Sequence, residues 1–215
     1  MLRKDLAPAI SSTFYERPAP EVARALLGRV LVRRLRSSQK LMAAMIVETE
    51  AYLPENDAAS HARRGKTKSN GSMFASPGTA YVYPIHAKYC FNVASDADGL
   101  GSAVLVRAVE PLLGVELMRR QRPIPHDRQL TNGPAKLCQA LAIDRSLDGW
   151  DLCRGQKIWI AAFQPQELLD YHVRRSERIG VTAAQSLKLR YYLEGNPFVS
   201  GTQKLNAAGE RVPSS

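Results

Sequence analysis

The sequence predicts a single α+β domain. Its 215 residues suit one compact unit with a sizeable core, and 45% of them are apolar, as in ordinary globular proteins. Strand patterns and helical patterns are interspersed without the regular alternation of parallel βαβ folds. No internal repeat or long linker divides the chain, so we treat residues 1–215 as one domain. Its last residues, from about 203, lack an apolar pattern and are expected to be frayed.

The expected elements follow from apolar spacing and from turn residues. Apolar residues recur at helical spacing between Pro20 and Gly28, which predicts a short helix. Alternation predicts strands over 30–35 and 41–52, joined by a turn at 37–38. The polar stretch 54–72 predicts a long loop. The later patterns predict strands over 79–83 (ended by Pro84), 88–93, 103–109, 158–162, 173–181 and 189–193, and helices over 113–120 and 134–143.

Composition narrows the classes of function. The 30 Lys and Arg residues exceed the 20 Asp and Glu residues, and a net charge of +10 favours anionic partners such as nucleic acid. No apolar run is long enough for a membrane span or a secretory signal. The three cysteines lie far apart without a CxxC pair, which argues against a disulfide framework and a cysteine zinc site. We therefore expect an intracellular monomer without membrane contact, cytoplasmic or nucleoid-associated in a bacterium and nuclear in a eukaryote.

The predicted strand over 41–52 carries the most informative polar residues. Successive strand side chains alternate between two faces, so Glu48, Glu50 and Tyr52 share one face, with neighbours roughly 6.5–7 Å apart. A carboxylate beside a phenol ring could pair an activated water with a stacking platform. Tyr81 and Tyr83 repeat the pattern in the strand over 79–83. Solvated glutamates and core tyrosines would explain the same residues without any site.

Three further residues attract attention as isolated polar groups. His61 lies in the basic loop and His86 lies just after Pro84, and no third ligand stands at the spacing that a metal site needs. Arg107 interrupts an apolar strand, and an unpaired buried arginine is costly, so it should contact a carboxylate or a ligand. A structural ion pair and a functional contact both remain open. The cations of this loop are candidate contacts to the phosphates of a nucleic acid: Arg63, Arg64, Lys66 and Lys68.

Taken together, ordered segments along most of the chain resemble a known family. The chain is similar to the alkyladenine (3-methyladenine) DNA glycosylases, monofunctional base-excision enzymes that lack a helix-hairpin-helix motif. The resemblance runs from near Phe14 to about Ser200. It rests on the segments 25–32, 46–52, 73–74, 77–83, 104–111, 132–141, 178–181 and 196–200.

The resemblance implies a fold, a substrate and roles for individual residues. The fold would be a single mixed domain with a curved, mostly antiparallel sheet flanked by helices. The partner would be double-stranded DNA containing alkylated or deaminated purines, such as 3-methyladenine, 7-methylguanine, hypoxanthine or ethenoadenine, and no metal or organic cofactor would be needed. Glu50 would be the general base, and Arg107 would lie near the attacking water and the target phosphate. Among the other residues, Tyr52, His61 and Tyr83 would stack on the flipped base, Asn92 would help to reject guanine, and His86 would intercalate in DNA where vertebrate relatives use tyrosine.

Two other functions fit part of the same pattern. A carbohydrate or nucleoside glycosidase could use Glu48 and Glu50 as its carboxylate pair, since their expected spacing overlaps the low end of the ~6.5–9.5 Å separation in inverting enzymes. A non-catalytic nucleic-acid-binding module of the same fold would need only the basic surface. Lys88 is the only lysine in the aromatic segments, so a Schiff-base mechanism is not expected.

Overall fold

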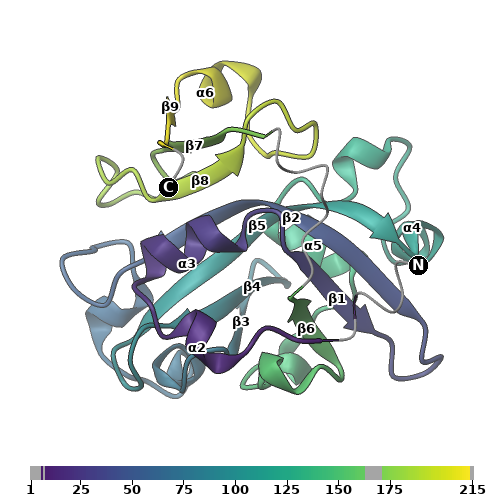
Figure 1. The fold of residues 1–215 in the computed structure, drawn as a ribbon, viewed down its shortest axis with the longest axis horizontal. Coiled ribbons are helices and arrows are strands. Elements are labelled where there is room, and N and C mark those ends of the chain that lie inside the picture. The colour runs from purple at the N-terminus through teal and green to yellow at the C-terminus, as the bar shows by residue number, and fades with distance from the viewer. Residues whose placement is uncertain (1–5, 7, 163–170, 214–215) are drawn as a thin grey trace.

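The structure is a computed structural model that describes residues 6, 8–162 and 171–213. Its centre is a β-sheet with strand order β3-β4-β5-β2-β8-β7-β9, to which β1 and β6 are joined along a second edge of β2 (Figure 1). The strand pairs are antiparallel, which confirms the predicted α+β fold with its mostly antiparallel sheet. The strands are β1 Val30–Arg34, β2 Leu41–Tyr52, β3 Ala80–Ile85, β4 Lys88–Ser95, β5 Ser102–Leu113, β6 Ile158–Ala161, β7 Val173–Ser176, β8 Arg190–Leu193 and β9 Glu210–Arg211.

Short helices flank the sheet. α3 packs on β2 and β5 through its buried apolar residues, and α5 packs on β4 and β5 (Figure 1). Pro20 lies in the first turn of α3, where its missing N–H costs nothing. The helices are α2 Ser12–Tyr15, α3 Ala19–Leu26, α4 Val115–Gln121, α5 Pro134–Ala140 and α6 Gln203–Ala207, and the 3-10 turns are η1 His61–Arg64, η2 Gly71–Phe74, η3 Asp127–Gln129, η4 Arg145–Leu147 and η5 Leu152–Arg154.

The two faces of the sheet have different composition, because paired residues of neighbouring strands project from the same face. On one face, Ala51, Val104, Val93 and Ala80 form a row across four strands, and all four are fully buried in the main core. That face and the helices packed on it supply most of the apolar burial. On the opposite face a second, smaller core lies over β1, β6 and the start of β2, and the part over β3, β4, β5 and the end of β2 carries the candidate site.

β2 is the strand that connects the two halves of the sheet. One edge pairs with β5 along most of its length, while the other edge pairs with β1 near its start and with β8 near its end. The β2–β5 ladder shifts register on both sides of Glu48, and Arg107 of β5 falls in this irregularity. Such bulges bend a strand and redirect side chains. Here the irregularity brings Arg107 to the two glutamates of β2.

Some elements differ from the predicted ones. β3 continues through Pro84 to Ile85, because β3 is an edge strand in which a missing N–H breaks no ladder bond. β5 extends to Leu113, and α4 begins only after Gly114, whose φ of 76° and close approach to Leu41 O exclude a larger side chain. The strand expected over 173–181 ends at Ser176.

The C-terminal segment is ordered where the sequence predicts a frayed end. α6 and β9 lie beside β7 and β8 (Figure 1), and β9 pairs with β7. The Thr202 side chain caps α6 by accepting a hydrogen bond from Leu205 N, and the Tyr192 hydroxyl donates to Asn206 O. These anchors are polar, so an apolar pattern could not reveal them.

Candidate active site

The site lies on the sheet face opposite the main core. Glu50, Leu105, Asn92 and Tyr81 form a row across β2, β5, β4 and β3. Beside this row the structure contains a cavity of about 670 Å³, which is within the usual range for small-ligand pockets. Side chains that line it include Tyr52, His61, Met73, Tyr81, Tyr83 and Asn92, and the segment 180–183 closes one side.

Glu50 lies directly behind the wall of this cavity and does not line it. Its side chain is fully buried. Oε2 accepts a hydrogen bond of 3.0 Å from the Tyr52 hydroxyl, and Oε1 accepts one of 2.8 Å from Ile179 N. Burial raises the pKa of the Glu50 carboxyl above its ordinary value, while the Arg107 charge and these two hydrogen bonds act in the opposite direction. A carboxylate with a raised pKa is suited to accept a proton near neutral pH.

Tyr52 joins Glu50 to the cavity and is held from behind by a buried ion pair. The Arg178 guanidinium stacks 4.6 Å from the centre of the Tyr52 ring. It donates two hydrogen bonds of 2.6 Å to Asp57, and both side chains are fully buried. Burial alone would raise the pKa of Asp57, but the hydrogen bonds from Arg178 and from backbone N–H groups hold it below its ordinary value. The pair therefore fixes the ring that faces the ligand.

Three aromatic rings form the opposite wall. The His61 ring lies edge-on to Tyr83 at 4.7 Å between centroids, and Tyr81 and Tyr83 are 5.3 Å apart. The His61 Nδ1 and the Tyr81 hydroxyl share a hydrogen bond of 2.8 Å. Desolvation of the ring and the charge of Arg64 lower the pKa of His61, which favours the neutral imidazole. The wall is thus electron-rich and uncharged at neutral pH.

Arg107 lies between the two glutamates of β2. Its Nε is 3.3 Å from Glu48 Oε1 and its Nη1 is 3.4 Å from Glu50 Oε1. Glu48 is fully buried, and its oxygens also accept hydrogen bonds from Arg190 Nε at 2.5 Å and from the N–H and hydroxyl of Ser200 at 2.7 and 2.9 Å. Glu48 is therefore not a solvated strand residue. The sequence led us to expect that Arg107 contacts a carboxylate or a ligand, and in the structure it contacts two carboxylates.

The structure brings only part of the predicted site together. Tyr52, His61, Tyr83 and Asn92 all line the cavity, and the Asn92 amide donates to Tyr81 O at 3.0 Å. His86 lies outside it, exposed on the β3–β4 turn with a φ of 45°, directly after two residues that do line it. The roles of these residues toward DNA remain predictions.

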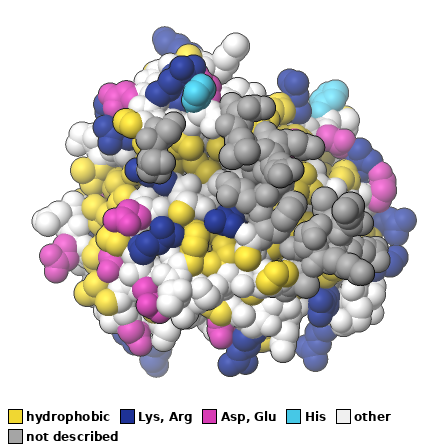
Figure 2. Space-filling view, in the orientation of Figure 1, with side chains coloured by type: hydrophobic (Ala, Val, Ile, Leu, Met, Phe, Trp, Pro, Cys, Tyr) yellow, Lys and Arg dark blue, Asp and Glu magenta, His cyan; other side chains and the backbone are white. Residues whose placement is uncertain are grey.

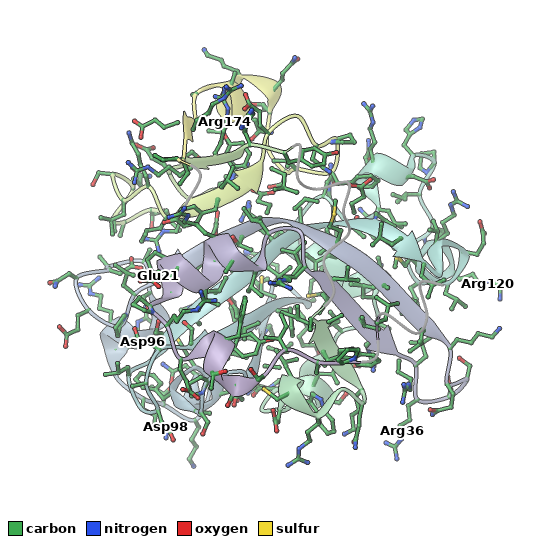
Figure 3. All side chains as sticks on the ribbon, in the orientation of Figure 1. Glu21, Arg36, Asp96, Asp98, Arg120 and Arg174 are labelled. Carbon is green, nitrogen blue, oxygen red and sulfur yellow. The ribbon has the colours of Figure 1, made fainter. Side chains whose placement is uncertain are left out.

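The basic loop lies at the mouth of the cavity. Arg63, Arg64, Lys66 and Lys68 are exposed, Arg64 lines the cavity, and within the described residues none of the four belongs to an ion pair. On the face seen in Figure 2, Lys and Arg side chains are scattered, many of them at its edge and a few nearer its centre. Figure 3 likewise shows Arg36, Arg120 and Arg174 at widely separated points of the surface.

The remaining observations concern what the site does not contain and what sequence reasoning missed. In the described part of the chain, no three His, Cys, Asp or Glu side chains are grouped as metal ligands, and no helix has the length and apolar character needed to cross a bilayer.

Sequence reasoning assigned no site role to Asp57, Arg178, Arg190 or Ser200. Arg178 and Ser200 belong to segments that carry the family resemblance, which was the available signal. Their partners lie 121 and 152 residues away, so spacing could not identify them.

Comparison with known proteins identifies the class that this fold and pocket define. The chain belongs to the methylpurine-DNA glycosylase family, whose family model matches residues 13–197. It is therefore a monofunctional DNA glycosylase, the class of enzyme that begins base-excision repair.

Individual relatives agree over most of the chain. It is 44% identical to a putative 3-methyladenine DNA glycosylase of Rhodopirellula baltica over 90% of this chain and 83% of that protein. It is 44% identical to the DNA-3-methyladenine glycosylase of Homo sapiens over 87% of this chain and 66% of that protein. A putative 3-methyladenine DNA glycosylase of Carboxydothermus hydrogenoformans is 45% identical over 87% of this chain and 96% of its own length.

Proposed function

We propose that the protein binds double-stranded DNA, accepts a flipped-out alkylated or deaminated purine in the aromatic cavity, and hydrolyses its N-glycosidic bond with Glu50 as the general base. The observation that carries the proposal is the buried Glu50 carboxylate, hydrogen-bonded to the hydroxyl of a ring that lines the cavity. The names of the relatives favour 3-methyladenine as one substrate.

The cavity suits a purine with a methylated ring nitrogen. Such a base is cationic, and the rings of Tyr52, Tyr83 and His61 offer it electron-rich surfaces in a partly desolvated space. Cation–π attraction in such a setting contributes about 2 kcal/mol or more. Because a base must leave the duplex to enter the cavity, damaged and mispaired bases, which cost less to extrude, are favoured.

The proposed reaction consists of one substitution at the sugar. Water adds its oxygen to the anomeric carbon, and Glu50 accepts the proton that the water loses. The C–N bond breaks with its electron pair going to the purine, which neutralises a cationic base without an added proton. The negative charge of Glu50 also stabilises the developing oxocarbenium ion. Glu50 is buried in the free protein, so we expect its contact with the attacking water to form when DNA binds.

The rival functions are less well supported. Glu48 lies on the far side of Arg107 from Glu50, is fully buried, and accepts hydrogen bonds from Arg190 and Ser200. It is therefore poorly placed to act as a second acid or base in a carbohydrate glycosidase. A non-catalytic DNA-binding module would not require a buried carboxylate behind its pocket, because desolvation of that charge costs free energy.

Single-turnover release of purines from oligonucleotides that carry 3-methyladenine, 7-methylguanine, hypoxanthine or ethenoadenine tests the proposal. Wild type should release at least one of these bases. Glu50→Gln should bind the same DNA but release the base at least about 100-fold more slowly, as expected when general-base help of about 10²–10⁴-fold is lost. Glu55→Gln, which neutralises an exposed carboxylate nearby, is the matched control. Wild type that releases none of these bases, or Glu50→Gln that remains fully active, would refute the proposal.

A further inference from the structure

Four charged groups behind the pocket, three of them fully buried, form a cluster. Glu48 and Glu50 come from β2, Arg107 comes from β5, and Arg190 comes from β8, directly opposite Glu50 in the β2–β8 ladder. The two carboxylates and two guanidinium groups balance in charge. Arg190 and Glu48 are fully buried, so the cluster depends on mutual pairing for its stability in a low-dielectric environment.

Ser200 connects this cluster to the C-terminal segment through four hydrogen bonds. Its N–H donates to Glu48 Oε2, its hydroxyl donates to Glu48 Oε1, and the same hydroxyl oxygen accepts a 3.0 Å hydrogen bond from Arg107 Nε. The carbonyl of Ser200 accepts a hydrogen bond from Arg190 as well. The hydroxyl therefore stands between Glu48 and Arg107 and satisfies both.

The planar guanidinium of Arg107 contacts different partners at its two ends. Arg107 is held on its Nε side by Ser200 and Glu48, while its Nη1 points to Glu50 at 3.4 Å. A planar guanidinium that is fixed at one end has a fixed position at the other end. Without the Nε contacts, Arg107 could turn away from Glu50, since its side chain is 12% exposed.

We propose that Ser200 and Glu48 are positioning residues, which hold Arg107 by its Nε and so keep its Nη1 against the Glu50 carboxylate. The proposal rests on the proposed function of Glu50 as general base. It gives the C-terminal segment around Ser200 a part in catalysis, although this segment lies outside the pocket and does not line it. Glu48 then serves to orient a cation and does not exchange protons with the substrate.

The consequence is a specific effect of Ser200 on the pH profile. Arg107 lowers the pKa of Glu50 against the effect of burial, so a loosened Arg107 raises that pKa further and displaces the acid limb of base release to higher pH. The groups that influence the charge of Glu50 or respond to it are Arg107, Glu48, Tyr52, Tyr83, Cys90 and Arg178. Ser200→Ala leaves each of these in place and removes only the hydroxyl.

The test compares Ser200→Ala with wild type by single-turnover base release as a function of pH and by lesion-DNA binding. We expect the rate at neutral pH to fall about 10- to 100-fold, as for a misplaced active-site group, to recover as the pH rises, and the affinity for lesion DNA to stay unchanged. Ser102→Ala is the matched control, because it removes another buried hydroxyl, bonded to Ser95, away from Arg107. It should leave the profile as in wild type.

Three outcomes would each overturn one of the two proposals. If Glu50→Gln abolishes release but the Ser200→Ala profile coincides with that of wild type, the positioning role is wrong and the role of the base stands. If Ser200→Ala lowers the rate equally at every pH, together with a lower melting temperature matched by Ser102→Ala, the effect is structural and the proposal also fails. If Glu50→Gln remains active, the proposed base is wrong, whatever Ser200→Ala shows.

Discussion

The Tyr52 hydroxyl donates a 3.0 Å hydrogen bond to Glu50 Oε2, and so connects a ring that lines the cavity to a carboxylate that does not. The two residues are separated by two positions in β2 and therefore project from the same face of the sheet. One side chain contacts the cavity, and the other is stabilised behind it. This contact makes the charge of Glu50 sensitive to changes in Tyr52.

Tyr52→Phe should separate the two roles of that residue. The phenyl ring keeps its stacking surface, but the hydroxyl that lowers the pKa of Glu50 is lost. We therefore expect lesion-DNA affinity to stay near that of wild type, while the acid limb of base release moves to higher pH. Single-turnover rates of base release measured over a broad pH range, for the variant and wild type side by side, would show it. An unchanged acid limb would contradict the proposed link between hydroxyl and base.

Glu50→Gln should change how the stability of the fold depends on pH, in addition to the cost of removing one carboxylate from the buried cluster. Burial raises the pKa of Glu50 in the folded state above its unfolded value, so the folded state holds the proton more tightly. The stability that this contributes is complete below the unfolded pKa and is lost as the pH rises through the folded pKa. Glutamine removes that loss. In thermal melts, the melting temperature of the variant should rise relative to that of wild type as the pH rises. An exposed substitution such as Glu21→Gln should show no such trend.

Asp57→Asn should destabilise the protein strongly. It leaves the fully buried Arg178 without its carboxylate, a change that typically costs about 3–5 kcal/mol in unfolding free energy. Denaturant titration measures the loss, and Asp127→Asn, which breaks the exposed Asp127–Arg119 pair, should have little effect. Because the pKa of Asp57 is lowered in the folded state, its contribution is present above the unfolded pKa and declines as the pH falls through the folded one. Equal effects of the two variants would contradict the importance of burial here.

His86→Ala should weaken binding to lesion DNA without changing the fold. An inserted side chain offsets part of the few kcal/mol needed to extrude a base, so its loss should reduce affinity by on the order of tenfold. The control is Ala87→Gly, which keeps the imidazole and suits the φ of 61° at that position. Fluorescence anisotropy with lesion and undamaged duplexes gives both affinities. An affinity that does not change would remove His86 from the DNA interface.

Neutral substitutions in the basic loop should reduce binding to all DNA sequences equally. Each phosphate contact releases counterions, which makes the slope of log affinity against log salt concentration negative. Replacing Arg63, Arg64, Lys66 or Lys68 by Gln should therefore reduce the magnitude of this slope by about 1. Arg36→Gln, at an exposed turn that does not line the cavity and is labelled at the edge of the molecule in Figure 3, is the control. A slope that is the same in the loop variants and in wild type would place the DNA elsewhere.

Strand alternation was enough to predict the face of β2 that carries the site. The bounds of the strand over 41–52 are confirmed, and Glu50 and Tyr52 do lie together. Alternation could not predict that Glu48 is buried, because burial depends on Arg190 of β8, 142 residues further along the chain. The register irregularity that redirects Arg107 depends likewise on how two distant strands pair.

Other differences arise from features that apolar patterns do not encode. Pro84 ends a strand only if its N–H is needed, and whether β3 is an edge strand depends on the topology of the whole sheet. The C-terminal segment is anchored by the cap at Thr202 and by a hydrogen bond to Asn206, both of which are polar. Local composition therefore predicts a frayed end where tertiary contacts produce an ordered one.

The pairing of β8 with the end of β2 affects the order in which parts of the protein can fold during synthesis. Arg190 emerges 142 residues after Glu48 during synthesis, and Ser200 follows it. A nascent chain can pair β2 with β1 and β5 and so bring Arg107 to the two glutamates, but it lacks Arg190, the second cation of the cluster, until β8 is made, and such long-range closure is slow. The four-charge cluster is therefore completed only when the part of the chain from Arg190 onward folds onto β2.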